Sequence, residues 1–584
     1  MTGAHLSSDL VERLAQMEGD RPDSTAYIFL PDGEREGGRW TYAELRRQTR
    51  AVGEALRRHA APGDRALLLY PSGLDFIAAF FGCLYAGVIA VPCPLPRPNR
   101  PSPRMAAILP DASPRWILST AAARRSLEAA PSLATATGVD WLDTDAVQAP
   151  AAASWRPAEV GSESVAFLQY TSGSTAAPRG VMVTRENLSA NLEMMRLTAD
   201  PALVRVIASW LPHFHDMGLI GTILYPFWCG GTGIMMPPES FFLRPVRWLE
   251  MISRYRAVFS VAPDFAYDLC ARQVRLDQCP GLDLRHWRIT YSGAETVRPD
   301  TLRRFTEVFG ASGFKPEAFL PCYGLAEATL MVSSAEGAGY RIAWFDPAGL
   351  ERGQARPLPA GRGRALTSCG RPRPGSRLRI VDPESARGLP DGAVGEVWTA
   401  GPQVARGYWN NPEATAAVFG GWTADGDGPF LRTGDLGFLA GGELFLVGRC
   451  KDLIILQGQN YYPDDIEASV ASAHPALRPR QGAAFSVDAG DGERLVVAHE
   501  IERAWRSAGT RPVLDAIRLA VAAEHGIRPH AVLLLRPHSL PTTSSGKVRR
   551  GECRRRFLAG ELAVEAEYRA TKDVAPQPPT RRAS

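Results

Sequence analysis

The chain has 584 residues, which exceeds the size of a single hydrophobic core and predicts at least two domains. Hydrophobic residues make up 45% and charged residues 22%, a composition that excludes an intrinsically disordered chain. With 66 Lys and Arg against 62 Asp and Glu, the net charge of +4 is too small to indicate a nucleic acid as the main partner.

The N-terminal residues 1–17 include acidic side chains and no long apolar run, so no signal peptide is predicted. The most apolar stretch, Phe76–Val91, is shorter than the roughly 20 residues of a membrane-spanning helix. We expect a buried helix followed by a buried strand there. The nine cysteines include no C-x-x-C pair, which argues against a metal cage and a disulfide framework. A cytoplasmic protein with reduced thiols and no membrane span is expected.

A helix is predicted over 40–56, because Thr41 and Glu44 have the spacing of a capping box and apolar residues then recur at helical intervals. Short apolar strands and amphipathic helices alternate after it, which predicts α/β layers with a largely parallel sheet. Glycine-rich sequence over 371–409 predicts an additional small β subdomain. The predicted strands are 66–70, 165–170, 206–211, 288–292 and 396–399, and the predicted helices are 249–255 and 299–309.

The sequence changes character after Gly448–Asp452. Residues 451–568 are predicted to form a small, mobile α+β C-terminal domain, with helices near 463–473 and 513–525. The Pro- and Arg-rich residues 569–584 are predicted to lack fixed structure. The expected fold class is therefore α/β, with a large N-terminal domain at 1–450 made of layered α/β subdomains plus the small β subdomain.

The strongest local signal is the loop Tyr170–Gly180, which follows a predicted apolar strand. Its hydroxyl-bearing and glycine residues can direct backbone N–H and O–H donors at a polyphosphate. The loop lacks the Walker pattern G-x-x-x-x-G-K-[ST], and taken alone it is also compatible with a flexible surface turn. The candidate phosphate-binding residues are Thr171, Ser172, Gly173, Ser174 and Thr175.

Six further motifs follow this loop in order: Trp210–Gly218, Ser292–Glu295, Tyr323–Glu327, Thr433–Gly437, Gly448–Arg449 and Ser545–Lys547. Together with the loop they resemble the adenylate-forming superfamily, which includes acyl-CoA ligases, nonribosomal adenylation domains and fatty acyl-AMP ligases. Ala176 and Arg179 stand where that superfamily usually has Gly and Lys. Because the fatty acyl-AMP ligases tolerate such changes, we expect the site to be functional.

The resemblance implies how a nucleotide would be held. Tyr323 would stack on the adenine, which needs a flat and partly apolar slot. Asp435 would accept hydrogen bonds from the ribose diol, and Arg449 would support the ribose or phosphate side. The backbone residues implied to line the nucleotide are Ser292, Gly293, Ala294 and Gly324.

The same resemblance implies the catalytic residues. Lys547 would lie between the attacking carboxylate and the α-phosphate, where negative charge accumulates. Glu327 would bind Mg²⁺, which prefers few carboxylates together with phosphate oxygens. His215 is a further catalytic candidate, and Lys451 occupies the position of the hinge about which the C-terminal domain rotates.

Three features resemble the fatty acyl-AMP ligase branch more than the CoA ligases. The segment His215–Gly221 and the aromatic stretch after Met236 match that branch, in which Ile234, Met235 and Phe241 would line an acyl channel. Residues 335–367 match the position of an insertion that disfavours CoA in that branch. Ordinary core packing for the aromatic stretch and a tolerated surface loop for 335–367 remain alternatives.

The expected function is ATP-dependent activation of a fatty acid to an acyl-adenylate, with transfer to the phosphopantetheine thiol of an acyl carrier protein acting in trans. The basic run Arg549–Arg556 could meet an acidic carrier, although such runs are usually solvated helix faces. The alternatives are a fatty acyl-CoA ligase, a nonribosomal amino-acid adenylation domain and a non-catalytic protein that binds an acyl-adenylate.

Overall fold

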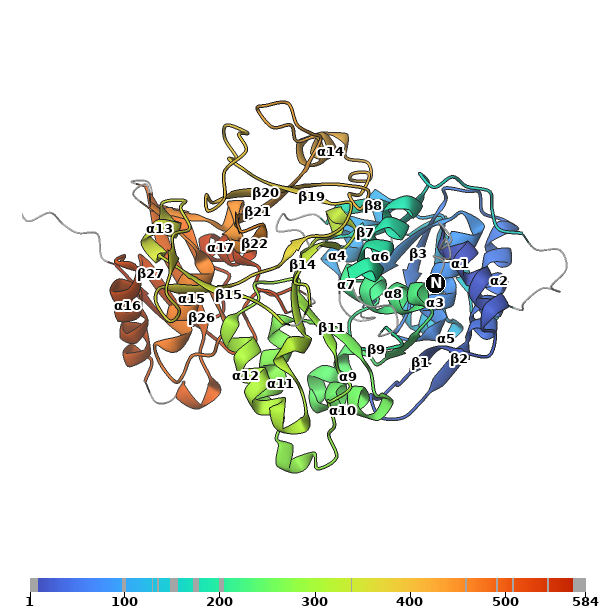
Figure 1. Cartoon of the computed structure of the whole chain (residues 1–584), viewed down its shortest axis with the longest axis horizontal. Coiled ribbons are helices and arrows are strands. Elements are labelled where there is room, and N and C mark those ends of the chain that lie inside the picture. Colours follow the sequence, from blue (N-terminus) through green and yellow to red (C-terminus); the bar gives the residue numbers. More distant parts are fainter. Residues whose placement is uncertain are drawn as a thin grey trace, which may run out of the picture. The chain divides into compact units, whose positions relative to one another are not determined.

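The computed structural model divides into two compact units, Met1–Leu446 and Val447–Ser584 (Figure 1). It has the mixed α/β architecture that the sequence predicts, with helices covering sheets. The residues that it describes are 9–96, 101–128, 130–133, 136–147, 156–171, 178–198, 204–337, 339–456, 459–489, 492–506, 509–543 and 546–570.

A six-stranded sheet in the first unit has the order β6-β5-β3-β4-β7-β8. Its strands are parallel except for β8, which runs antiparallel to β7. The loop between β7 and β8 is the predicted phosphate loop, so the sheet places that loop at the carboxyl end of β7. The strands are β3 (Arg65–Leu69), β4 (Ile89–Cys93), β5 (Trp116–Ser119), β6 (Asp140–Asp143), β7 (Val165–Tyr170) and β8 (Gly180–Thr184).

A nine-stranded sheet has the order β18-β14-β13-β12-β11-β9-β10-β1-β2. The strands from β1 through β10, β9, β11 and β12 to β13 are parallel, so the loops that follow β9, β11, β12 and β13 leave from one edge. This edge is where α/β proteins usually bind ligands. The strands are β1 (Thr25–Phe29), β2 (Gly38–Thr41), β9 (Val206–Ser209), β10 (Thr232–Met235), β11 (Phe259–Pro263), β12 (Ile289–Gly293), β13 (Phe319–Gly324), β14 (Met331–Ser334) and β18 (Arg371–Pro372).

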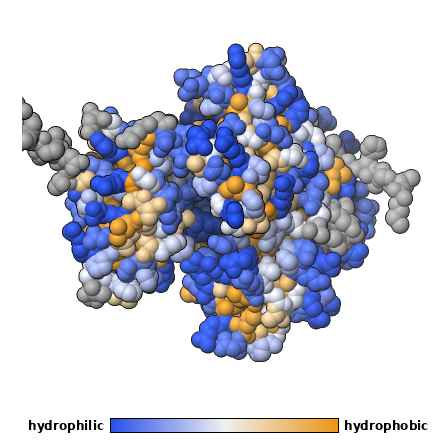
Figure 2. All heavy atoms as spheres, turned by 60° about the vertical axis from the view of Figure 1, so that its left-hand side comes forward, coloured by the Kyte–Doolittle hydropathy of each residue, from blue (hydrophilic) through white to orange (hydrophobic). Residues whose placement is uncertain are grey.

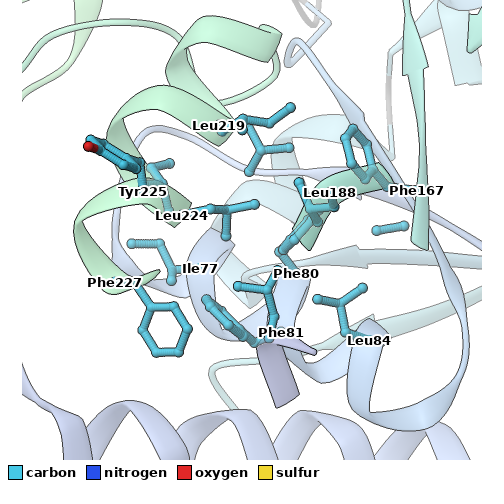
Figure 3. Packing of buried hydrophobic residues seen from close by; sticks show 14 of the residues in the cluster. Ile77, Phe80, Phe81, Leu84, Phe167, Leu188, Leu219, Leu224, Tyr225 and Phe227 are labelled. Atoms are coloured by element: carbon cyan, nitrogen blue, oxygen red, sulfur yellow. The ribbon is translucent and has the colours of Figure 1, made fainter. Parts of the chain in front are cut away.

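Helix α3 (Leu74–Ala86) is buried at every residue except Asp75 in its first turn. Its Ile77, Phe80, Phe81 and Leu84 pack with side chains from the six-stranded sheet and from the helical segment at 219–229 (Figure 3). A helix that is apolar all round has to be covered by other elements, and here it is followed by the buried strand β4. The expected buried helix and strand over Phe76–Val91 are therefore confirmed.

The helices of the first unit include α2, whose capping box forms as predicted between Thr41 and Glu44. No helix in the described parts of the chain is long and apolar enough to cross a bilayer. The face drawn in Figure 2 is largely hydrophilic, with small separate apolar areas. The helices are α1 (Leu10–Asp20), α2 (Tyr42–Arg57), α4 (Pro103–Ala112), α5 (Ala121–Leu127), α6 (Arg185–Thr198), α7 (Asp216–Gly218), the π-helix η2 (Leu219–Leu224), α8 (Tyr225–Cys229), α9 (Pro238–Leu243), α10 (Val246–Tyr255), α11 (Asp264–Gln273), α12 (Pro299–Phe309), α13 (Pro347–Glu351) and α14 (Pro412–Phe419).

The small β subdomain predicted over 371–409 extends further along the chain, because two of the strands of its sheet follow residue 409. The four-stranded sheet consists of β19 (Arg377–Val381), β20 (Gly395–Ala400), β21 (Leu431–Ala440) and β22 (Glu443–Arg449). The segment 335–367 is not an irregular loop. It contains α13 and a three-stranded sheet of β15 (Ile342–Phe345), β16 (Pro357–Leu358) and β17 (Arg364–Thr367). Phe345 of this segment is 2% exposed, and its ring centroid lies 4.9 Å from that of Phe438 and 5.4 Å from that of Phe445.

The second unit is built on a four-stranded sheet with apolar clusters on both faces. Strand β25 pairs antiparallel with β26, β26 parallel with β27, and β27 antiparallel with β28. Its elements are β23 (Ile454–Leu456), β24 (Gln459–Tyr461), α15 (Pro463–Ser472), β25 (Gly482–Asp488), β26 (Glu493–Glu500), α16 (Arg511–His525), β27 (Ala531–Leu535), α17 (Arg550–Ala559) and β28 (Val564–Arg569). Short 3₁₀ turns in the two units are η1 (Pro131–Leu133), η3 (Leu276–Gln278), η4 (Gly310–Ser312), η5 (Pro316–Ala318), η6 (Ala326–Ala328), η7 (Cys450–Asp452) and η8 (Arg503–Trp505).

Candidate active site

The predicted phosphate loop is closed at its base by a hydrogen bond from the Thr171 amide to the Arg179 carbonyl, at 3.1 Å. Tyr170, the last residue of β7, donates its hydroxyl to Asp111 at 2.5 Å. Arg104 donates to the Tyr170 carbonyl at 2.8 Å. The strand end before the loop is thus held by side chains of α4. Ser172, Gly173, Ser174 and Thr175 lie outside the described residues.

The predicted adenine-lining residues lie at the carboxyl end of β12 and directly after it, next to β13. Ser292 pairs with Pro321 in the parallel register of these two strands. A Cβ on Gly293 would lie 2.7 Å from the Cys322 sulfur, so only glycine lets the backbones approach this closely. Ala294 has the positive φ of 62°, which is uncommon for a residue with a side chain. The Ser292 hydroxyl is buried and has no protein partner among the residues that the structure describes, as expected for a polar atom that a ligand satisfies.

Tyr323 and Asp435, the residues predicted to bind adenine and ribose, are in direct contact. The Tyr323 hydroxyl donates to an Asp435 carboxylate oxygen at 2.7 Å, and both residues are buried. Gly324 is the last residue of β13, and a Cβ added to it would lie 1.7 Å from the Leu330 carbonyl oxygen. The fold therefore brings an aromatic ring and a carboxylate together beside the end of β12.

The predicted metal ligand Glu327 lies in η6, just after β13. Its Oε1 accepts a hydrogen bond from the Tyr408 hydroxyl at 2.8 Å, and its carbonyl accepts one from the Ala405 amide at 2.9 Å. Glu327 is only partly buried. A carboxylate at such a position is the kind of oxygen ligand that Mg²⁺ prefers.

His215 lies at the N-terminus of α7, where its Nδ1 is 2.6 Å from an Asp216 carboxylate oxygen. The Met217 amide donates to the same Asp216 oxygen at 2.7 Å. The helix then passes into the π-helical turn η2, an irregularity that is frequent at functional sites. His215 is thus held beside the carboxylate of the next residue in the sequence, at the N-terminus of a helix.

The structure does not bring the three predicted acyl-channel residues together. Ile234 and Phe241 belong to one apolar cluster, whereas Met235 belongs to the cluster on the other face of the sheet. Successive residues of a strand point to opposite faces, so Ile234 and Met235 of β10 cannot share a wall. Phe241 is fully buried and stacks on Trp210 with ring centroids 3.9 Å apart.

Lys547 lies in a hairpin of the second unit. The Thr543 amide donates to the Lys547 carbonyl at 2.8 Å, and the Lys547 amide donates to the Thr543 hydroxyl at 3.0 Å. The hairpin is tied to β26 because the Leu540 amide donates to Glu500 at 2.7 Å. Ser545, in the same motif, lies outside the described residues.

The predicted hinge Lys451 lies in η7, directly after Arg449, which ends β22. Its neighbour Asp452 contacts Arg550, the first residue of α17, at 3.5 Å. Arg550 also binds Asp464 and Glu467, at 2.5 Å and 2.7 Å. These ion pairs link the hinge turn to the helix that follows the Lys547 hairpin.

Comparison with known proteins identifies the family of this chain. Residues 14–409 match a family model described as AMP-binding enzyme. The chain belongs to the AMP-binding enzyme family. Residues 451–567 match a second model, described as Disco-interacting protein 2-like, AMP domain.

Within this family the chain is similar to fatty acyl-AMP ligases, as its motifs predicted. It is 41% identical over 567 residues to the medium-chain-fatty-acid–[acyl-carrier-protein] ligase JamA of Moorena producens, covering 95% of this chain and 96% of that one. It is 37% identical over 581 residues to the long-chain-fatty-acid–AMP ligase FadD23 of Mycobacterium tuberculosis, covering 95% and 98%. A fatty acyl-adenylate ligase of Legionella pneumophila, solved with acyl adenylate and pyrophosphate, matches with a TM-score of 0.74 and 36% identity, covering 96% and 98%.

The sequence did not identify the contacts of two residues of this AMP-binding enzyme: Tyr408, which contacts the predicted metal ligand Glu327, and Arg550, which contacts Asp452 next to the predicted hinge. Tyr408 lies in a glycine-rich stretch that suggested only a small β subdomain, and no spacing relates it to Glu327. Arg550 belongs to a basic run interpreted as a solvated face or a carrier-binding surface, yet it is largely buried among carboxylates. Arg555 and Arg556 of that run pair with Glu552 on the same helix.

Proposed function

We propose that this enzyme converts a fatty acid and ATP to an acyl-adenylate and pyrophosphate, and then transfers the acyl group to the phosphopantetheine thiol of an acyl carrier protein. The observation that carries the proposal is the hydrogen bond from Tyr323 to Asp435, beside the buried Ser292 hydroxyl. It pairs a stacking surface for adenine with an acceptor for a ribose diol. The similarity to JamA supports the choice of a carrier protein as acceptor.

In the first half-reaction a carboxylate oxygen of the fatty acid bonds to the α-phosphorus of ATP, and the bond to the β-phosphate oxygen breaks. A fatty acid is already ionised near neutral pH, so no general base is needed and catalysis consists of positioning and charge stabilisation. Lys547 supplies a compact positive charge for the pentacovalent phosphorus. The Thr171–Thr175 loop would bind the departing pyrophosphate oxygens.

The residues present fit a Mg²⁺ ion. Glu327 offers an oxygen ligand at the edge of the nucleotide site, and one of its lone-pair positions accepts the Tyr408 hydroxyl. A bound Mg²⁺ would neutralise charge on the leaving pyrophosphate. Glu327 holds the cation in this proposal, and Arg449 supports the ribose or phosphate side.

In the second half-reaction the thiol sulfur of the carrier attacks the acyl carbonyl carbon, and AMP leaves as the carbonyl–oxygen bond breaks. His215, at the start of α7, is proposed to act near the carboxyl group of the fatty acid. Exposed Arg554 and Arg555 on α17 offer positive charge to an acidic carrier. The resemblance assigns rotation about Lys451 to the step between the two half-reactions.

The proposal is tested by measuring pyrophosphate release from ATP with a mixed pool of fatty acids, followed by mass spectrometry of the adenylates. We expect release to depend on the fatty acid and to fall about 100-fold or more in Lys547→Ala. Lys547→Arg should not restore pyrophosphate release, because the planar guanidinium of arginine cannot replace a compact ammonium group. The exposed Lys315→Arg is the matched control and should behave like the wild type.

The competing functions give different results in the same assay. Rapid acyl-CoA formation on addition of CoA would favour a CoA ligase. Amino-acid-dependent release would favour an amino-acid adenylation domain. Tight acyl-adenylate binding with no release for any acid would indicate a non-catalytic binding protein.

A further inference from the structure

The segment 403–409 holds the loop that carries Glu327. The Ala405 amide donates to the Glu327 carbonyl at 2.9 Å. Two residues after Glu327, the Thr329 hydroxyl donates to the Gln403 carbonyl at 2.7 Å. The position of the candidate metal ligand is therefore set by a segment about 80 residues later in the chain.

The loop needs this support because its backbone is strained. Thr329 has φ of 64° and ψ of −62°, and the Leu330 amide donates to the Ala328 carbonyl at 2.7 Å. These values describe a three-residue γ-turn of the rare, strained kind. Such a turn persists only where its surroundings determine it, and it is often found at functional sites. Thr329 is fully buried.

The other side of segment 403–409 is attached to β8, the strand that follows the phosphate loop. The Met182 amide donates to the Gly407 carbonyl at 2.8 Å, and the Trp409 amide donates to the Gly180 carbonyl at 2.7 Å. The segment is therefore a physical bridge between the candidate metal ligand and the base of the phosphate loop.

Tyr408 is the residue of this bridge whose side chain reaches both ends. Its hydroxyl donates to Glu327 at 2.8 Å, and the Arg179 guanidinium carbon lies 5.1 Å from the centre of its ring. Tyr408 is 5% exposed.

We propose that Tyr408 is a positioning residue that orients the Glu327 carboxylate toward a divalent cation and couples it to Arg179 at the end of the phosphate loop. A hydrogen bond to one carboxylate oxygen restricts rotation of the carboxylate and directs its remaining lone pairs. Part of the role of Arg179 is then its cation–π contact with the Tyr408 ring. This proposal rests on the proposed function, because it takes Glu327 as the ligand of a nucleotide-bound cation.

The test is Tyr408→Phe, which removes the hydroxyl and keeps the ring under Arg179. Binding of the Mn²⁺ complex of a non-hydrolysable ATP analogue to the full chain is followed by electron paramagnetic resonance. We expect Tyr408→Phe to weaken this binding about 10-fold, as is typical for an outer-shell partner of a metal ligand. Binding of the analogue without a divalent cation should change much less.

Tyr225→Phe is the matched control, because Tyr225 is also buried and its hydroxyl donates to the Met195 carbonyl, at 3.2 Å. It should bind the Mn²⁺ complex like the wild type. If Tyr408 acts through Glu327, the double variant Tyr408→Phe/Glu327→Gln should bind no more weakly than Glu327→Gln alone.

Wild-type affinity in Tyr408→Phe, or a full additional loss in the double variant, would overturn the role of Tyr408. The binding measurement contains no fatty acid, so it is independent of the overall reaction. Absence of fatty-acid-dependent pyrophosphate release would instead refute the proposed function.

Discussion

His213 is a buried imidazole next to the candidate active site. It is 7% exposed, and its ring centroid lies 4.2 Å from that of Phe76. Burial lowers the pKa of His213 from 6.5 to about 3. Between these two values the unfolded chain binds a proton that the folded chain does not bind. The free energy of unfolding therefore decreases as the pH falls below 6.5.

We predict that His213→Phe reduces this acid sensitivity. At pH 4.5 the wild-type imidazole should cost about 3 kcal/mol of stability relative to pH 7, since one unit of pKa shift is roughly 1.4 kcal/mol. Denaturant unfolding at the two pH values measures the difference. His59→Phe, at an exposed position, should retain the wild-type pH dependence. Equal losses of stability in His213→Phe and the wild type would contradict the prediction.

The inserted element 335–367 is anchored by packing and by backbone pairing. Besides the Phe345 ring contacts, the Ala355 amide donates to the Gly392 carbonyl at 2.7 Å, and the Val394 amide donates to the Gly353 carbonyl at 2.9 Å. The insert thus has a definite structure with a fixed attachment to the small β subdomain. This fits the proposal, taken from the resemblance, that it limits the use of CoA.

Phe345→Ala should weaken this attachment by about 3 kcal/mol or more, because it removes a buried aromatic ring. If the insert disfavours CoA, the ratio of acyl-CoA to acyl-adenylate should rise several-fold when CoA is supplied. Phe81→Ala, at a fully buried position in α3, is the control for loss of core packing. An unchanged product ratio in Phe345→Ala would count against the role of the insert.

At the scale of the whole molecule, the chain has two compact units and Lys451 lies just inside the second. A hinge residue must absorb a change in backbone dihedral angles, and proline fixes φ near −65°. We predict that Lys451→Pro permits either adenylate formation or thiol transfer, but not both. Pyrophosphate exchange measures the first step, and single-turnover reaction of preformed acyl-adenylate with a carrier protein measures the second.

Lys451→Ala distinguishes an effect of backbone conformation from an effect of the side-chain charge. It removes the ammonium group but leaves φ free, so it should retain both half-reactions if the hinge role is correct. Equal impairment of both steps by Lys451→Pro would reject the hinge. Loss of one step in Lys451→Ala would assign the effect to the side chain.

The elements that the sequence predicted well are those with local signals. The strand 165–170 and the helix 299–309 have the predicted bounds, because a short continuous buried run, a proline at the helix start and a buried apolar face act within one segment. The family was also determined by sequence alone, since its motifs are short and ordered. The insert was missed as a folded element because strands of two to four residues are too short to show a period.

The contacts within the site depended on the tertiary structure. Tyr323 and Asp435 are 112 residues apart, and Glu327 and Tyr408 are 81 apart, so no local pattern relates them. Ile234 and Met235 are adjacent in sequence but lie on opposite faces of a sheet. The sequence by itself determined which chemical groups are present and in what order. Only the tertiary structure decided which of them meet, because Asp435 lies in the small antiparallel sheet that packs against Tyr323, and Tyr408 lies in a segment bonded to the Glu327 loop.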